Sequence, residues 1–273
     1  MTQDGFQQAA EAISTAQIMI ITCGAGMGVD SGLPDFRGDT GFWKAYPMYE
    51  RLGLSFVQAA NPEHFDRDPH FGWGFYGHRT ELYRRTIPHE GFKLLDEWRD
   101  RFEMDNFVVT SNVDGQFQKA DYPDDRILEV HGSIHHLQCT TPCKNSIWDN
   151  TVSFDIDHAT MRANHVPRCP HCGQTARPNI LMFGDYGWLH HRTAQQEDRF
   201  QSFLQRSAGK KTVVIEMGAG TSVPTIRHLS EQLGQRGNTT VVRINPREAH
   251  IRAGHIGLSC GSVEALKSIA DLL

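Results

Sequence analysis

Two pairs of closely spaced cysteines carry the clearest chemistry in this sequence. Three residues separate the members of the first pair and two separate those of the second: Cys139, Cys143, Cys169 and Cys172. Such pairs supply four thiolates to a tetrahedral zinc, and four sulfur ligands leave no open position for water or substrate. The alternative is four unmetallated thiols, but residues 138–178 are rich in proline, have few aliphatic residues and need a metal to hold them. The spacing therefore predicts a structural zinc site.

A glycine-rich segment begins directly after the first apolar run, residues 18–23 (IMIITC), which is typical of a buried parallel strand. Gly24, Gly26 and Gly28 allow the backbone to approach a pyrophosphate at a helix N-terminus, although the same pattern suits a tight strand-to-helix turn. The acidic residue that binds ribose in dehydrogenases is not found at the end of a second strand, because an aromatic stretch starts at Gly41. The segment favours a nucleotide loop outside the usual dehydrogenase arrangement.

Polar residues follow several other apolar runs. Asn112 and Asp114 follow the run 107–110, and His131 follows the run 127–130. An aspartate accepts hydrogen bonds from a carboxamide, an asparagine orients water or a ribose, and a histidine is partly neutral at pH 7 and acts as a base. A helix cap explains the first two residues equally well, and a hydrogen-bonded structural histidine explains the third. These residues are candidates for a catalytic site.

The segment Gly24–Gly38 (GAGMGVDSGLPDFRG) resembles the first signature of the sirtuins, the NAD-dependent protein-lysine deacylases, whose pattern is GAGxSxxSGIPDFR. The segment TSNVD at 110–114 resembles their TQNID, and HGS at 131–133 matches their catalytic HGS. Further elements follow in the family's order: FGD at 183–185 for FGE, GTS at 220–222 and IN at 244–245. The resemblance covers about residues 10–273.

The resemblance implies a mechanism and a set of NAD-binding residues. In sirtuins the acyl-lysine oxygen attacks C1′ of the nicotinamide ribose, nicotinamide leaves, and a histidine deprotonates the ribose. That role falls to His131, with Asn112 beside the reacting ribose and Asp114 on the carboxamide. Phe36 would shield the ribose and Arg37 would order the cofactor loop. The residues expected to bind NAD are Gly24, Ala25, Gly26, Gly28, Asp35, Phe36, Arg37, Ser111, Val113, Gly218, Gly220, Thr221, Ser222, Asn245, Gly261 and Ser262.

The expected substrate end contains Tyr76 and Arg79, which share one face if their segment is helical. A Tyr-x-x-Arg at the corresponding place meets the acyl carboxylate in sirtuins that remove malonyl, succinyl or glutaryl groups. A phenol and a guanidinium together can hold a carboxylate, whereas a surface arginine beside a packed tyrosine is the alternative. Phe183, Gly184 and Asp185 are also expected to bind substrate.

Two departures weaken the match. Gly28 replaces the serine of GAGxS, and Ser111 replaces the glutamine of TQN. The segments 24–38, 79–92 and 110–120 also resemble class M, macrodomain-linked sirtuins, some of which transfer ADP-ribose to a lipoyl-carrier protein and lack the catalytic histidine. Because His131 is present, the resemblance favours deacylation. The alternatives are a protein ADP-ribosyltransferase and an NAD-binding module without turnover.

Alternating elements must position these residues. Apolar runs predict strands at 18–23, 107–110, 127–130, 180–183, 212–217 and 241–244, and helical patterns occur at 3–15, 90–101, 193–207, 223–235 and 262–273. The alternation predicts an α/β fold with a Rossmann-like parallel sheet covered by helices on both faces. The expected large lobe comprises residues 1–38, 90–137 and 179–273, and a helical insertion (39–89) and a zinc-binding insertion (138–178) form the small lobe.

Composition limits the remaining classes. With 273 residues, 39% of them hydrophobic, the chain can form one large domain or two modest ones. The net charge of −5 gives no reason to expect nucleic acid or an anionic membrane as partner. Neither a secretory leader nor an apolar stretch of about 20 residues is evident, so we expect a cytoplasmic protein acting on an acylated protein or peptide.

Overall fold

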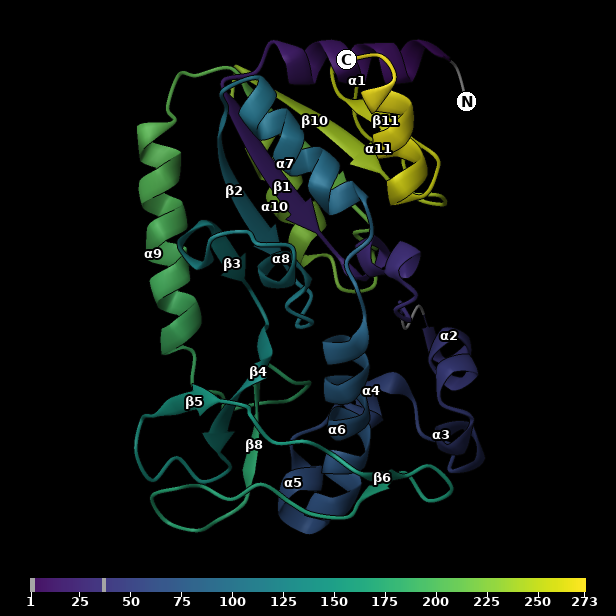
Figure 1. Ribbon diagram of the computed structural model, residues 1–273, viewed down its shortest axis with the longest axis vertical. Coiled ribbons are helices and arrows are strands. Elements are labelled where there is room, and N and C mark those ends of the chain that lie inside the picture. The colour runs from purple at the N-terminus through teal and green to yellow at the C-terminus, as the bar shows by residue number, and fades with distance from the viewer. Residues whose placement is uncertain (1–2, 36–37) are drawn as a thin grey trace.

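A six-stranded sheet forms the centre of the large lobe in the computed structural model, which describes residues 3–35 and 38–273. The predicted residues Phe36 and Arg37 lie outside the described residues. The strands lie in the order β11-β10-β9-β1-β2-β3 and every neighbouring pair is parallel (Figure 1). Their bounds are β1 Ile18–Cys23, β2 Asp105–Thr110, β3 Ile127–Glu129, β9 Thr212–Met217, β10 Thr239–Ile244 and β11 Ile256–Leu258.

Helices cover both faces of this sheet, which is why most of its strand residues are buried. On one face lie α1 (Gln3–Ser14), α7 (Gly91–Arg101) and α11 (Ser262–Ala270), whose apolar side chains share one core cluster. On the other face lie α9 (His191–Arg206) and α10 (Thr225–Leu233), which form a second cluster with Phe107 and Val214. The predicted α/β class with helices on both faces is confirmed.

The centre of the sheet contains a topological switch point, because β1 lies between β9 and β2 and the connections diverge there. The loops after β1 and β9 contact each other backbone to backbone. A Cβ on Gly24 would lie 2.8 Å from the carbonyl oxygen of Gly218. Gly218 itself has φ +62, and a Cβ there would lie 2.4 Å from the backbone of Gly26. Glycine is therefore required at both strand ends, and the segment after β1 continues as a short 3₁₀ helix, Ala25–Ser31.

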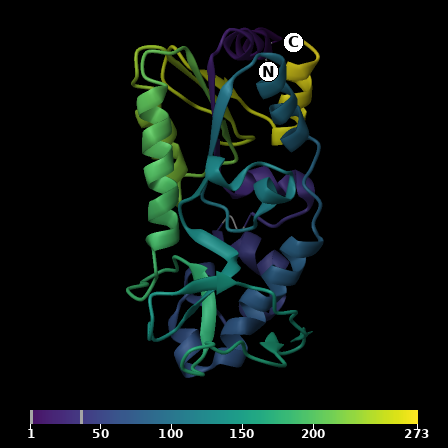
Figure 2. The same ribbon diagram turned by 60° about the vertical axis from the view of Figure 1, so that its left-hand side comes forward.

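The small lobe has a separate core rich in aromatic side chains, and it occupies the lower half of Figures 1 and 2. Its helices are α2 (Gly38–Ala45), α3 (Pro47–Arg51), α4 (Phe56–Ala59), α5 (Glu63–Arg67) and α6 (Pro69–Arg85). Its main sheet is antiparallel, in the order β5 (Ile147–Asp149), β4 (Gly132–Cys139), β8 (Ala176–Ile180), and a two-stranded ribbon joins β6 (Ile156–Asp157) to β7 (Arg162–Ala163). The remaining elements are α8 (Gln116–Lys119) and the 3₁₀ turn Asp124–Arg126.

Five of the six predicted parallel strands occur where expected, and one prediction was wrong. The run 180–183 is not a strand of the parallel sheet: β8 ends at Ile180, and Met182 packs in the core of the small lobe. The sixth parallel strand is β11, which the apolar pattern missed because it has only three residues. All five predicted helices form within a few residues of their expected ends. The exact division of the chain into lobes stays a prediction.

Candidate functional site

A cleft of about 880 Å³ lies between the carboxyl edge of the parallel sheet and the small lobe. Its size falls within the range of small-molecule and cofactor sites. Most predicted site residues line it: Gly24, Ala25, Asp35, Tyr76, Arg79, Ser111, Asn112, Val113, Asp114, His131, Phe183, Gly184, Asp185, Gly218, Gly220, Thr221 and Ser222. The described residues Gly26, Gly28, Asn245, Gly261 and Ser262 do not line it. The fold thus brings the catalytic and most of the cofactor candidates into one cavity.

His131 lies where the chain passes from β3 to β4. Its carbonyl oxygen accepts a hydrogen bond from the N–H of Leu181 at 2.9 Å, and its imidazole is hydrogen-bonded to the backbone of Ser111. Burial lowers the pKa of His131 below its ordinary value, and the hydrogen bond with Ser111 opposes this only in part. The imidazole is therefore neutral at pH 7, as a general base must be.

Asn112 and Asp114 follow β2 on the same wall of the cleft. The amide of Asn112 donates to the carbonyl oxygen of Gly24 at 3.1 Å, which ties the β2 end to the glycine loop. One carboxylate oxygen of Asp114 accepts from the N–H of Gln116 at 3.0 Å, so the turn-capping interpretation holds for this residue as well. Burial raises the pKa of Asp114 to about 6, and the negative charge of Glu129 adds to the rise. At neutral pH this carboxylate is ionised and able to accept a further donor.

The end of the cleft formed by the loops after β9 and β10 contains residues that the sequence did not indicate. Glu248 and Arg247 line it, and a carboxylate oxygen of Glu248 accepts from the hydroxyl of Thr221 at 2.7 Å. Asn245 lies beneath this end and uses its side chain internally: it donates to Ala219 and accepts from the N–H groups of Arg247 and Glu248. In the sequence, the only signal for Glu248 was its position three residues after Asn245, which follows a predicted strand.

Helix α6 places Tyr76, Arg79 and Tyr83 on the opposite wall. The Nε and Nη2 of Arg79 donate to the hydroxyl of Tyr83 at 2.9 and 2.7 Å, and the guanidinium carbon lies 5.1 Å from the centre of the Phe75 ring. Arg79 is only 7% exposed, which contradicts the alternative of a surface arginine. Burial raises the pKa of Tyr76 to about 12, so its phenol remains a hydrogen-bond donor at neutral pH. Tyr83, absent from our prediction, completes this group.

Asp185 lines the cleft but directs its carboxylate toward Arg177. One oxygen accepts from Arg177 Nη1 at 3.0 Å and from the N–H of Gly187 at 3.0 Å, and the other oxygen bonds Arg177 Nη2 and the N–H of Met182. Both side chains are almost completely buried. A buried carboxylate satisfied in this way holds the loop 182–187 in position, next to Phe183 and Gly184 in the cleft wall.

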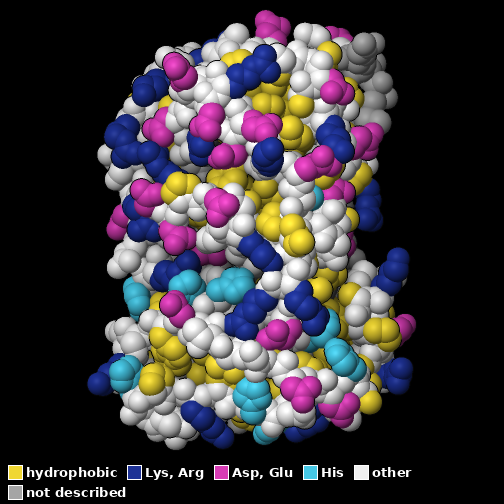
Figure 3. All heavy atoms as spheres, in the orientation of Figure 1, with side chains coloured by type: hydrophobic (Ala, Val, Ile, Leu, Met, Phe, Trp, Pro, Cys, Tyr) yellow, Lys and Arg dark blue, Asp and Glu magenta, His cyan; other side chains and the backbone are white. Residues whose placement is uncertain are grey.

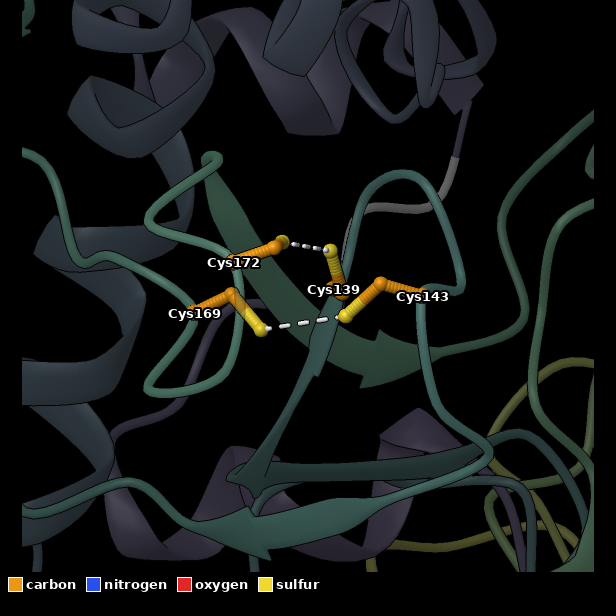
Figure 4. A group of neighbouring side chains, drawn as sticks. All are labelled: Cys139, Cys143, Cys169 and Cys172. Carbon is orange, nitrogen blue, oxygen red and sulfur yellow. Dashed lines mark hydrogen bonds between the residues drawn. The ribbon is translucent and has the colours of Figure 1, made fainter.

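The four predicted zinc ligands form a compact group at the far end of β4, away from the cleft residues. Their sulfur atoms all lie within 4.8 Å of one another, with 3.6 Å between Cys139 and Cys172 and 3.7 Å between Cys143 and Cys169 (Figure 4). A tetrahedral zinc with Zn–S bonds of about 2.3 Å requires sulfur atoms about 3.8 Å apart. The cluster fits a structural zinc, as the cysteine spacing predicts.

In the part of the chain that the structure describes, no helix has both the length and the apolar character needed to cross a membrane. Figure 3 shows acidic and basic side chains interspersed over the face drawn there, with histidines mainly in its lower half.

Comparison with known proteins agrees with this geometry. The model of the Sir2 family matches residues 24–223. The NAD-dependent protein deacylase 1 of Caldanaerobacter subterraneus is 27% identical over 261 residues, covering 95% of each chain. The NAD-dependent protein deacylase of Thermococcus kodakarensis is 32% identical over 178 residues, which cover 65% of this chain and 63% of that protein.

Solved structures share the fold. A Sir2 homologue in complex with NAD has a TM-score of 0.73 at 23% identity, covering 97% of this chain and 93% of the other. A second Sir2 structure, with a deacetylated p53 peptide and 3′-O-acetyl ADP-ribose, has a TM-score of 0.66 at 20% identity and covers 97% and 96%. Because the family model spans most of the chain and the same architecture surrounds the cleft, this protein belongs to the Sir2 family.

Proposed function

We propose that this protein is an NAD-dependent protein-lysine deacylase that produces nicotinamide, O-acyl-ADP-ribose and free lysine. The observation that carries the proposal is the neutral, half-buried imidazole of His131 in one cavity with Asn112, Asp114 and the loops after β1 and β9. The deacylases of C. subterraneus and T. kodakarensis support it through their similarity to this chain. The roles of the individual site residues are part of the proposal.

Some cleft residues bind NAD, and one accepts a proton. NAD, when bound, supplies an electrophilic ribose carbon and nicotinamide as a leaving group. The ionised carboxylate of Asp114 accepts the carboxamide N–H, and Asn112, already tied to Gly24, holds the adjoining ribose. His131 accepts a proton from a ribose hydroxyl because its lowered pKa keeps it unprotonated.

The residues at the cleft end near Thr221 and Glu248 suit the adenosine half of NAD. Glu248 and Thr221 present a carboxylate and a hydroxyl 2.7 Å apart in the cleft wall. A carboxylate at the end of a Rossmann-type strand binds ribose hydroxyls, and its charge repels the extra phosphate of NADP. Gly220 lies beside it, since a Cβ there would come within 3.8 Å of the Glu248 carboxylate. We therefore assign NAD rather than NADP to this site.

The buried group of Tyr76, Arg79 and Tyr83 supports a preference for acidic acyl chains. Arg79 keeps its charge in an aromatic environment, where a carboxylate partner is held strongly. Tyr76 and Tyr83 add neutral phenols on either side of it. Malonyl, succinyl and glutaryl groups carry the carboxylate that this arrangement suits, whereas an acetyl group offers only a methyl.

The acylated lysine would enter from a partly apolar rim. Val57, Leu181, Tyr186 and Val223 line the cleft, and each exposes more than a third of its surface. Tyr186 is fully exposed. A rim of this kind suits a peptide segment of a protein substrate. A cytoplasmic location stays a prediction, supported by a cysteine cluster whose zinc needs reduced thiols.

ADP-ribosyl transfer is the second candidate, supported by the two departures from the sirtuin pattern. The hydroxyl of Ser111 lies 3.4 Å from the carbonyl oxygen of Cys23 and points back to the sheet. A Cβ on Gly28 would come within 3.1 Å of Leu33. Ser111 lines the cleft, whereas Gly28 lies in the 3₁₀ helix after β1 and does not line it. Both residues lie in segments that resemble class M proteins, and a lipoyl-carrier protein is the acceptor class to test. The intact His131 favours deacylation over this candidate and over binding without turnover.

A panel of acetyl-, malonyl-, succinyl- and glutaryl-lysine peptides incubated with NAD tests the proposal by mass spectrometry. We expect NAD-dependent loss of the acyl mass, release of nicotinamide and faster turnover of the acidic acyl groups. Adenine-labelled NAD in the same reactions reports transfer to protein. If label enters a lipoyl-carrier protein and no peptide is deacylated, the second candidate replaces the first.

A further inference from the structure

Strand β3 leads the chain to His131 but lies at an edge of the parallel sheet. Among the described strands its partner is β2 alone, through Val108–Thr110. The outer side of an edge strand leaves its N–H and C=O groups without a strand partner. Here α9 runs along that side (Figures 1 and 2). The helix therefore covers the edge of the sheet that a further strand would otherwise cover.

Side chains from the first half of α9 bind the last residue of β3. Gln196 accepts from the N–H of Glu129 at 3.1 Å, and the hydroxyl of Thr193 donates to the Glu129 carbonyl at 3.2 Å. The carboxylate of Glu129 accepts from Arg192 at 2.6 Å and from Gln196 at 3.4 Å. Every polar group of Glu129 except one carboxylate oxygen is thus bound by α9.

These contacts are shielded from water. Glu129 is 1% exposed, Gln196 3% and Thr193 5%. A buried backbone group without a partner is unfavourable, so losing either contact favours a shift of the strand end. The contacts therefore constrain the backbone of Glu129 and not only the side chains around it.

Glu129 is two residues before His131, and the chain beyond the histidine is also held. Gly132 has φ +78, and a Cβ there would lie 2.1 Å from the carbonyl oxygen of Asn179. Because β4 begins at Gly132 in close contact with β8, the imidazole has little freedom on that side. On the other side of the histidine, the backbone is held by the pairing of β3 with β2 and by the α9 contacts at Glu129.

We infer that Thr193 and Gln196 are positioning residues: by binding the backbone of Glu129 they hold the His131 imidazole at the place in the cleft where it acts as a base. Neither side chain lines the cleft, so we assign both an indirect role. The inference rests on the proposed function for its kinetic consequences. The predicted effect on the position of the His131 imidazole does not depend on that function.

The direct test is the pKa of His131, followed by NMR of imidazole-labelled protein across a pH titration. In the wild type, burial keeps this pKa below the ordinary value. In Thr193→Val and Gln196→Ala we expect it to rise toward about 6.5, because a displaced imidazole regains water. Thr193→Ser retains the hydroxyl and should keep the wild-type pKa. Gln195→Ala removes the exposed neighbour of Gln196 on the same helix and is the matched control.

Kinetics with the acyl peptide provide the second readout. We expect Thr193→Val and Gln196→Ala each to lower kcat for deacylation about tenfold with little change in KM for NAD, and Thr193→Ser to restore it. The inference is overturned if Thr193→Val and Gln196→Ala lose only thermal stability while the pKa of His131 and kcat stay unchanged. It is also overturned if Thr193→Ser is as impaired as Thr193→Val. If the wild type deacylates no peptide, the proposed function fails, but the NMR titration still decides the positioning role.

Discussion

The two lobes contribute to the cleft by different physical means. The large lobe presents short polar side chains and glycines at the ends of parallel strands, in places set by the strand order. The small lobe presents bulky side chains from α6, held by an aromatic core, and it carries the four-cysteine cluster. Strand topology therefore sets the positions of the polar cleft residues in the large lobe, whereas side-chain packing sets those of Tyr76 and Arg79 in the small lobe.

This difference predicts that loss of the metal destabilises the small lobe and leaves the large lobe folded. Cys139→Ser with Cys172→Ser, or removal of zinc by a chelator, should unfold the cysteine-bearing part of the small lobe, because the metal joins the two segments that carry the cysteine pairs. Metal analysis should find about one zinc per chain in the wild type. Hydrogen exchange should show lost protection in β4, β5 and β8, with protection in β1 and β9 retained. A metal-free wild type with a stable small lobe contradicts this prediction.

Substitution of His131 tests the large lobe alone. His131→Ala should lower deacylation at least about a hundredfold, since it removes the general base, while NAD still binds. Single-turnover assays and calorimetric NAD titration separate the two effects. His228→Ala, at an exposed position on α10, serves as the control. An unchanged rate in His131→Ala would show that another group supplies the base.

Substitution of Arg79 tests the small lobe's contribution. Arg79→Met keeps the stem but removes the charge, so the ratio of succinyl to acetyl turnover should fall about tenfold or more. Tyr83→Phe, which removes only the hydroxyl that binds Arg79, should have a smaller effect. The two kcat/KM ratios are measured on one peptide sequence. Equal loss for both acyl groups would mean that Arg79 supports the fold of α6 and not acyl choice.

The smallest expected effect concerns pH. Because burial raises the pKa of Asp114 to about 6, its carboxylate becomes protonated below that pH and loses the charge that accepts the nicotinamide amide. NAD affinity should therefore fall as pH drops through 6, by up to about tenfold per unit. Asp114→Asn should bind weakly and lose this dependence. Calorimetry at several pH values measures both, and a flat wild-type profile refutes the assignment.

Local patterns were sufficient for much of this molecule. The parallel strands at 18–23 and 212–217 were predictable because a strand buried on both faces is mostly apolar. The zinc cluster was predictable because ligand spacing is a property of the chain. The same apolar signal misplaced 180–183, since a loop that packs in a core needs the same residues as a buried strand.

The site divides in the same way. Its catalytic candidates follow predicted strands, so the sequence by itself determined that His131, Asn112 and Asp114 would meet at one edge of a sheet. Only the tertiary structure decided that Glu248 meets Thr221 and that the side chain of Asn245 is used beneath the cleft. Those pairings connect segments more than twenty residues apart whose approach depends on packing, and no local periodicity records which long-range neighbours a side chain will find.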